Sequence, residues 1–348
     1  CWQVRAANAP MLSAASLRLA PSPVALFTSE VCLKHEPGWF SPERPERLSS
    51  LLEAMRAEWA TEFAGQLSIR EPDVDVTAEQ LLRVHTPAHL ARLDGAFGRV
   101  GGFLAPRVNL DADTVVSPGT HAAARRAAGL VVAAVDEVLG ASGSGVSRAF
   151  VMARPPGHHA EPDQPMGFCL YNNVMVGAAH AQAAHGVGRI AVLDFDVHHG
   201  NGCAAACWSD PSRLYASTHQ QDLFPAGVSE FTPVGSGRAG EHGQVLSHVL
   251  LAGSGSEAFR AAWATQLLPA VCAFEPEAIF LSAGFDAHAQ EEVASLALRD
   301  DDFAWITAEV VALGLPTVSV LEGGYNLGAL SRGVRCHLHA LIHGHGDE

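Results

Sequence analysis

The sequence predicts an α/β fold in which a single domain is built on one parallel β-sheet flanked by helices. Four apolar runs of strand length occupy residues 149–153, 190–193, 278–284 and 317–321, and stretches with helical patterns separate them. Strands that alternate with helices favour one doubly wound unit. The chain has 348 residues, of which 48% are hydrophobic, so it can bury one large core or two modest ones.

Each of these runs ends in residues that can bind or react. The first run leads into His158 and His159. The third run leads into Asp286, and the fourth leads into Tyr325 beside two glycines. In a parallel α/β sheet, ligands bind just beyond the carboxyl ends of the strands. The four strand ends together therefore predict a reactive site at that edge of the sheet.

The second run, at 190–193, has the densest set of polar residues at its end. It is followed by Asp194, Asp196, His198 and His199. On an extended segment Asp196 and His198 point to the same side, because they are two residues apart. One oxygen and one nitrogen donor at one strand end suit a zinc site. The alternative for this segment alone is a pair of strand-terminal caps and a solvated histidine.

Five motifs then appear in a fixed order along the chain. They are R-P-P-G-H-H-A from Arg154, G-F-C-L-Y-N-N from Gly167, D-F-D-V-H-H-G-N-G from Asp194, S-A-G-F-D-A-H from Ser282 and L-E-G-G-Y from Leu321. With these motifs the chain resembles the zinc-dependent deacetylases of the histone deacetylase and acetylpolyamine amidohydrolase superfamily, most closely the class II-like bacterial members. The resemblance runs from about residue 24 to about residue 341. It implies a parallel-sheet α/β domain shared in outline with arginases.

The resemblance implies a set of metal ligands. Carried over by position, the zinc ligands are Asp196, His198 and Asp286. Three protein ligands leave a position for water and substrate, as in catalytic zinc sites. The resemblance also implies a monovalent cation site, usually potassium, to which Asp194 and Ser217 contribute.

The resemblance implies catalytic groups beside the metal. His158 and His159 would act in general acid–base catalysis, and Tyr325 would donate its hydroxyl to the developing oxyanion. Asp194 would pair with His158, and Asn201 would pair with His159. A neutral amide stabilises an imidazolium less than a carboxylate does, so we expect the pKa of His159 to lie below that of His158. The histidines outside these motifs are expected to be structural or solvated; they are His35, His85, His89, His121, His180, His185, His242 and His248.

The resemblance also implies a substrate tunnel. Phe168 and Phe224 match its two aromatic walls, next to Gly167, and parallel aromatic faces would hold an aliphatic stem. Polyamine-specific relatives carry a gatekeeper carboxylate at the tunnel mouth. Here the expected position falls on Val293, so Glu292, directly before it, is the candidate gatekeeper, with an ordinary surface glutamate as the alternative.

The function implied is a zinc amidohydrolase that removes acetyl or other short acyl groups from acyl-lysine or acylated polyamines with a metal-activated water. One alternative is an arginase-like ureohydrolase with two manganese ions, but Asp286 and His288 are not followed by the additional aspartate that this chemistry needs. A second alternative is a catalytically silent acyl-lysine-binding protein. The intact set of ligands and catalytic groups argues against it.

Composition limits the partners. Lys and Arg number 22 against 37 Asp and Glu, a formal charge of −15, which argues against direct nucleic-acid binding and would attract a polyamine or a lysine-rich segment. No run is long and apolar enough to span a membrane, so no membrane partner is expected. Seven cysteines are too few for a disulfide scaffold in a chain of this length. A homo-oligomer is a further expectation.

The first residues differ from the rest of the chain. Residues 1–29 contain no Asp or Glu and are rich in alanine and serine. We expect residues 1–22 to be a leader or a disordered extension and residues 23–348 to form the catalytic domain. A cytoplasmic location is expected, with a mitochondrial or plastid location as the alternative because the acid-free leader resembles a transit peptide.

Overall fold

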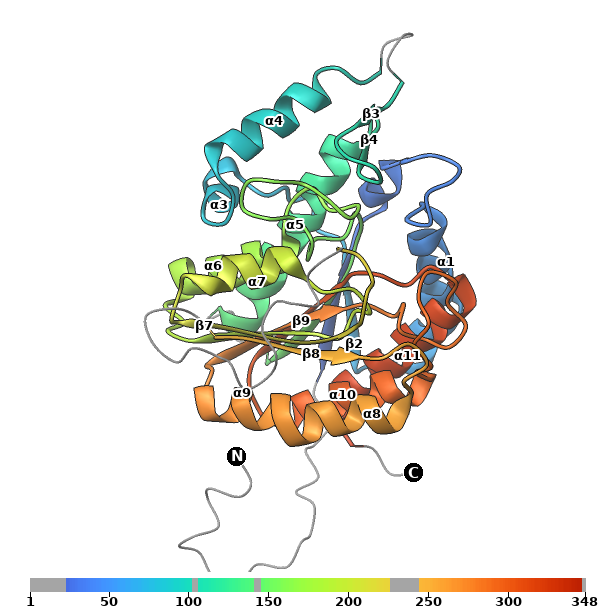
Figure 1. Ribbon diagram of the computed structural model, residues 1–348, viewed down its shortest axis with the longest axis vertical. Coiled ribbons are helices and arrows are strands. Elements are labelled where there is room, and N and C mark those ends of the chain that lie inside the picture. The colour runs from blue at the N-terminus through green and yellow to red at the C-terminus, as the bar shows by residue number, and fades with distance from the viewer. Residues whose placement is uncertain (1–22, 102–105, 141–144, 226–243, 346–348) are drawn as a thin grey trace, which may run out of the picture.

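The fold is known from a computed structural model, which describes residues 23–101, 106–140, 145–225 and 244–345. The leader expected at residues 1–22 lies outside the described residues. The predicted α/β class is confirmed, because one sheet with helices on both faces forms the molecule (Figure 1). None of the helices within the described ranges combines the length and the apolar character that crossing a membrane requires.

The main sheet has eight strands in the order β2-β1-β5-β10-β9-β6-β7-β8, and each neighbouring pair is parallel. The strands are β1 (Val24–Thr28), β2 (Leu67–Arg70), β5 (Arg148–Met152), β6 (Ile190–Asp194), β7 (Arg213–Gln220), β8 (Gln244–Leu250), β9 (Ala278–Ala283) and β10 (Thr317–Leu321). A small antiparallel pair is formed by β3 (Val108–Asn109) and β4 (Val115–Val116). The four strands predicted from sequence are β5, β10, β9 and β6, which are adjacent in the centre of the sheet.

Helices cover both faces of this sheet. In Figure 1, α5, α6 and α7 lie on one side, and α8, α9, α10 and α11 lie on the other. The α-helices are α1 (Glu46–Ala54), α2 (Ala60–Glu62), α3 (Ala78–Leu82), α4 (Pro87–Phe97), α5 (Thr120–Leu139), α6 (Asn173–His185), α7 (Asn201–Trp208), α8 (Ser256–Ala262), α9 (Leu268–Phe274), α10 (Asp300–Val311) and α11 (Leu327–His343). A 3-10 helix spans Glu30–Lys34, and π-helical turns span Met55–Trp59 and Trp263–Leu267.

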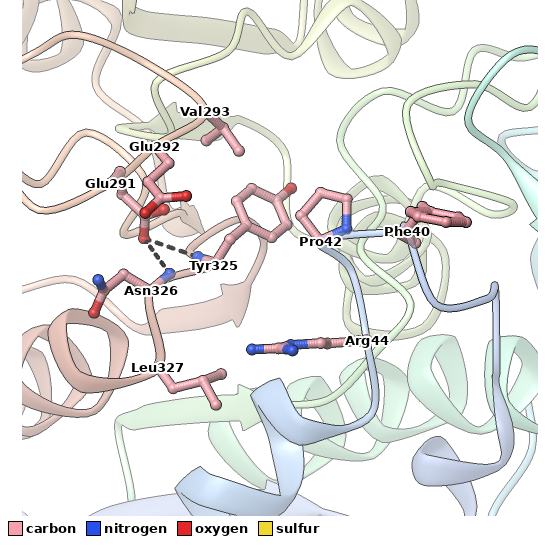
Figure 2. A pocket seen from close by; sticks show the side chains of 10 residues that line it. Phe40, Pro42, Arg44, Glu291, Glu292, Val293, Tyr325, Asn326 and Leu327 are labelled. Carbon is pink, nitrogen blue, oxygen red and sulfur yellow. Dashed lines mark hydrogen bonds between the residues drawn. The ribbon is translucent and has the colours of Figure 1, made fainter.

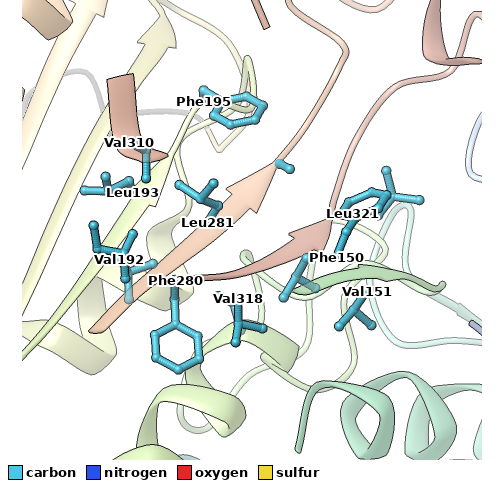
Figure 3. Packing of buried hydrophobic residues seen from close by; sticks show 14 of the residues in the cluster. Phe150, Val151, Val192, Leu193, Phe195, Phe280, Leu281, Val310, Val318 and Leu321 are labelled. Atoms are coloured by element: carbon cyan, nitrogen blue, oxygen red, sulfur yellow. The ribbon is translucent and has the colours of Figure 1, made fainter. Parts of the chain in front are cut away.

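The central strands are buried on both faces, which explains why they read as continuous apolar runs rather than alternating patterns. Phe150, Val192, Phe280 and Leu281 are fully buried, and Val318 is nearly so (Figure 3). Burying such a side chain stabilises the fold by about 1.5–3 kcal/mol, so this layer stabilises the central sheet.

Helix α6 packs against α5 on one face of the sheet. It begins at Asn172, whose side chain accepts a hydrogen bond from the backbone N–H of Met175 (3.1 Å). It ends at Gly186, which adopts the left-handed conformation (φ 68°) common at helix ends. A Cβ on Gly177 would lie 2.5 Å from the Val131 side chain of α5, so α5 and α6 pack in close contact.

Candidate metal centre and active site

The loops after β6 and β9 bring together the three predicted metal ligands. His198 Nδ1 lies 3.0 Å from Asp196 Oδ1 and 3.1 Å from Asp286 Oδ2. Both carboxylates are completely buried. Burial and the nearby Asp196 carboxylate raise the pKa of Asp286, because two negative groups share one buried site. Two carboxylates and one imidazole at this spacing fit a zinc ion, which takes oxygen and nitrogen donors.

Backbone groups hold these carboxylates in place. Gly323 N–H donates to Asp196 Oδ2 (2.8 Å), and Val197 N–H donates to Asp286 Oδ1 (2.9 Å). A Cβ on Gly284 or on Gly323 would lie 2.0 Å from a carboxylate oxygen of Asp196 or Asp286, respectively. The glycines in the two motifs are therefore needed because the backbone passes directly against the donor atoms.

The two predicted catalytic histidines lie beside this group, with ring centroids 4.0 Å apart. His158 Nδ1 lies 3.0 Å from Asp194 Oδ2, and His159 Nδ1 lies 2.8 Å from Asn201 Oδ1. The structure thus forms both pairs that the sequence suggested. In each pair the Nε2 atom of the ring is left for contact with other groups.

The two histidines differ in pKa in the expected direction. Burial opposes the charged form of His158, but the carboxylates of Asp196 and Asp194 outweigh it and raise its pKa to about 10. Burial and the positive charge of His158 lower the pKa of His159 well below its usual value. The hydrogen bond to Asn201 raises the pKa of His159 less than burial and the charges of His158 and His198 lower it, whereas the carboxylate partner Asp194 helps to raise the pKa of His158.

Tyr325 follows β10 on the loop that contains Gly323 and Gly324. Desolvation and the negative charge of Asp286 raise the pKa of Tyr325 well above its usual value, so its hydroxyl stays protonated and can donate. Arg47 holds this loop from one side. Its guanidinium donates to the carbonyls of Gly324 and Glu322 (2.5 Å each) and lies 4.9 Å from the centre of the Tyr325 ring.

Glu291 holds the same loop from the other side, and sequence reasoning missed it. Its Oε1 accepts hydrogen bonds from the backbone N–H groups of Tyr325 (2.8 Å) and Asn326 (2.9 Å), as Figure 2 shows. Burial raises the pKa of Glu291 to about 7. The sequence contains two consecutive glutamates here, and no local signal tells which of Glu291 and Glu292 turns inward.

The predicted tunnel residues surround the catalytic groups. The Phe224 ring lies 4.9 Å from the His159 ring, and the Phe168 ring lies 6.0 Å from the Tyr325 ring. Gly167 has a positive φ of 56°, and a Cβ there would lie 2.5 Å from the His159 ring. The structure therefore brings these residues to the predicted side of the site.

Glu292 lies at a cavity next to Tyr325. The cavity has a volume of about 360 Å³ and is lined by residues that include Phe40, Arg44, Glu292 and Val293 (Figure 2). Glu292 is exposed, as expected for a residue at the mouth of a substrate tunnel. Arg44 places a positive charge on the same cavity. The structure thus places Glu292 close to the predicted site.

The predicted cation-site residues lie side by side on the neighbouring strands β6 and β7. Asp194 of β6 is paired in register with Ser217 of β7, and both are fully buried. Tyr215 donates its hydroxyl hydrogen to Asp194 Oδ2 (2.9 Å), and Asp196 N–H donates to Asp194 Oδ1 (3.1 Å). Asp194 thus joins the histidine pair to the strand that carries Ser217.

The fold is an α/β domain on a parallel sheet, with a candidate metal centre, a histidine pair and a phenol at one edge. Comparison with known proteins gives the family. Residues 41–341 match the histone deacetylase domain. The chain therefore belongs to the histone deacetylase family, whose members include amidohydrolases.

Individual relatives agree with this membership. The chain is 37% identical over 327 residues to the histone deacetylase-like amidohydrolase of Pseudomonas aeruginosa, covering 87% of this chain and 81% of that protein. It is 34% identical over 318 residues to the human polyamine deacetylase HDAC10, covering 87% of this chain and 46% of that protein. Its structure is similar to the crystal structure of the HDA15 HD domain, with a TM-score of 0.83, 29% identity, and coverage of 94% of this chain and 91% of that one.

Proposed function

We propose that the protein is a zinc-dependent amidohydrolase that removes acetyl or other short acyl groups from acyl-lysine or acylated polyamines. The observation that carries the proposal is the convergence of one donor group, a histidine pair and a phenol at one edge of the sheet. Asp196, His198 and Asp286 would hold the zinc ion. A bound zinc ion would polarise the acyl carbonyl and lower the pKa of a neighbouring water molecule toward about 7.

The protein's own groups would move the protons. Asp194 and Asn201 engage the Nδ1 atoms of His158 and His159, and His158 Nε2 lies 3.9 Å from Asp196 Oδ2 of the metal group. One of the two Nε2 atoms would remove a proton from the attacking water, and one would return a proton to the leaving amine. Tyr325 would donate a hydrogen bond to the carbonyl oxygen as negative charge develops on it.

Other residues would bind the substrate and a second ion. Phe168 and Phe224 would flank the aliphatic stem of an acylated amine and exclude water from it. Asp194 and Ser217 would contribute to a potassium site beneath the metal centre. Residues 23–348 would form the catalytic domain. A cytoplasmic or organellar location, a homo-oligomer and the absence of nucleic-acid binding stay predictions.

The two alternatives are less well supported. An arginase-like ureohydrolase needs donors for two metal ions, whereas one three-donor group lies at this site among the residues that the structure describes. A silent acyl-lysine-binding protein would not need a histidine pair with its partners in place.

A turnover assay tests the proposal directly. The zinc-loaded protein is given an acetyl-lysine peptide, N-acetylated polyamines and a longer-chain acyl-lysine peptide, with and without a chelator. We expect hydrolysis of at least one of these, loss of it with the chelator and recovery on addition of zinc. Hydrolysis that resists complete zinc removal would contradict the metal mechanism, and no turnover of any substrate would contradict the substrate class.

We predict that Glu291→Ala lowers kcat on an acetyl-lysine peptide by about tenfold and leaves KM nearly unchanged. The variant loses the acceptor that holds the Tyr325 loop, and hydrogen bonds to a charged group are worth about 1.5–3 kcal/mol. Glu291→Gln retains a carbonyl oxygen and should restore most of the rate. Glu292→Ala, at the exposed neighbouring position, is the matched control. Equal losses in the Glu291→Ala and Glu292→Ala proteins would exclude this positioning role.

We predict that Glu292→Gln lowers kcat/KM for N-acetylated polyamines by up to about fivefold, the size of an exposed charge interaction. Turnover of an acetyl-lysine peptide should stay within error, because its backbone at the mouth carries no ammonium group. A loss that is the same for both substrate classes would exclude Glu292 as gatekeeper.

A further inference from the structure

A second group of metal-binding side chains lies away from the candidate active site. It consists of Asp136 on α5 and of His180 and His185 on α6. Within the described part of the chain, this group and the one at Asp196 are the two sets of three donors whose ligand atoms all lie within 4.8 Å of one another. Sequence reasoning expected His180 and His185 to be structural or solvated. The structure instead brings both to one carboxylate.

The spacing of the three donors suits a metal ion. Asp136 Oδ1 lies 2.9 Å from His180 Nε2 and 2.8 Å from His185 Nε2. The two imidazole rings are nearly perpendicular, with centroids 5.7 Å apart. A zinc ion bound about 2.0–2.1 Å from each donor has ligand atoms about 3 Å apart, so shifts of a few tenths of an ångström would complete the site.

The donors are held in place and are also accessible. The side chains of His180 and His185 are 9% and 17% exposed, whereas the Asp136 side chain is 55% exposed. Both histidines belong to one helix, and close packing at Gly177 fixes that helix against α5. The protein thus orients the two imidazoles, and the open side at Asp136 leaves room for water ligands.

The local charges favour a cation. All three donors lie within the last turns of α5 and α6, where unpaired backbone carbonyls give helix ends a partial negative charge. One group opposes it. Arg83 Nη1 lies 3.1 Å from His180 Nδ1 and donates to it, so in this arrangement His180 Nε2 holds the ring proton that faces Asp136.

Metal binding at His180 Nε2 would require the proton of the neutral ring to move from Nε2 to Nδ1. With His180 Nε2 on a metal ion, the ring carries its proton on Nδ1, which can no longer accept from Arg83. Arg83 would turn away and keep its second partner, Glu79, which accepts from Nη2 at 3.0 Å. Arg83 therefore competes with the metal ion rather than assisting it.

We propose that Asp136, His180 and His185 form a second metal site, which takes a divalent transition metal of the zinc type and joins α5 to α6. Two imidazoles and one carboxylate suit zinc, cobalt, nickel or copper ions and do not suit magnesium or calcium. The site lies at the end of α6 opposite to Asn172, which holds the His158 loop through Ala160 (3.1 Å). A helix of 13 residues is about 20 Å long, so the two metal groups are separate sites.

Metal analysis after equilibrium dialysis of the full chain against Zn²⁺ tests the proposal. We expect two zinc ions per wild-type chain, and one zinc ion per chain in His185→Ala and in Asp136→Asn. In each variant the affinity of the second site for zinc should fall at least tenfold. His198→Ala should retain the ion at the second site. Added zinc should raise the melting temperature of the wild type but not that of His185→Ala, since a ligand that binds the folded state stabilises it.

Two further variants separate this site from nonspecific binding. His343→Ala is a matched control, because His343 belongs to another histidine pair, in which its ring centroid lies 4.5 Å from that of His339. This variant should keep the second ion bound. Arg83→Gln should raise the affinity of the second ion several-fold, an effect that general destabilisation would not produce. Equal zinc content in the wild type and in His185→Ala, or loss of the second ion in His343→Ala and not in His185→Ala, would overturn the proposal. We expect the wild type and His185→Ala to deacetylate at equal rates. The test of the second site therefore does not depend on the proposed function.

Discussion

His198→Ala is expected to remove the catalytic metal and abolish turnover. The variant loses the single nitrogen donor and leaves Asp196 and Asp286 as two buried carboxylates facing an empty volume. Loss of a direct ligand should exceed the roughly 10–100-fold cost in metal affinity that follows loss of an outer hydrogen-bond partner. Zinc content and turnover are measured together, in a His185→Ala background so that the second site adds no metal.

A control for this variant is His199→Ala, at the neighbouring imidazole. His199 Nε2 lies 3.1 Å from Ser247 Oγ and takes no part in the metal group. We expect that variant to keep its catalytic zinc. If the His198→Ala, His185→Ala protein still bound one zinc ion per chain, the ligand assignment would be wrong.

Tyr325→Phe is expected to keep the zinc ion and to lower kcat by about 10²–10³-fold, the range found when one oxyanion donor is removed. The ring remains, so its contact with Phe168 and its place above Arg47 are preserved. KM should change little, because the hydroxyl acts on charge that develops in the transition state. The measurement is steady-state kinetics on the best substrate of the turnover assay, with zinc content determined in parallel.

The fold of the catalytic variant should be intact. Its melting temperature is expected within about 2–4 °C of the wild type, the shift that 1 kcal/mol causes in a chain of 150–250 residues or more. Wild-type kcat in Tyr325→Phe would show that another group stabilises the oxyanion.

Some of the structure follows from the sequence alone. The four central strands could be predicted because strands buried on both faces contain almost no polar residues. The donor residues could be predicted to meet, because parallel strands place their carboxyl ends at one edge. The candidate ligands Asp196, His198 and Asp286 came from the family resemblance that motifs such as the one from Asp194 carry.

Other features depended on contacts between residues far apart in the chain. The order β5-β10-β9-β6 differs from the order along the sequence, and it decides which loops face one another. Glu291 and Glu292 are chemically equivalent in the sequence, and only the path of the loop turns Glu291 toward Tyr325. The pKa of His158 is raised because the carboxylates of Asp196 and Asp194 outweigh its burial, whereas burial and the charge of His158 lower the pKa of His159. The distances between these groups, which set the balance, come from the tertiary structure.

The group formed by Asp136, His180 and His185 also combines a feature that follows from the sequence with one that depends on tertiary packing. The sequence places His180 and His185 five residues apart in one segment, which the structure shows as helix α6 between Asn172 and Gly186. It did not determine that Asp136, 44 residues before His180, meets both rings. That meeting results from the packing of α5 against α6. Local periodicity sets which element a residue belongs to, but the direction of its side chain and its partners are set by packing in three dimensions.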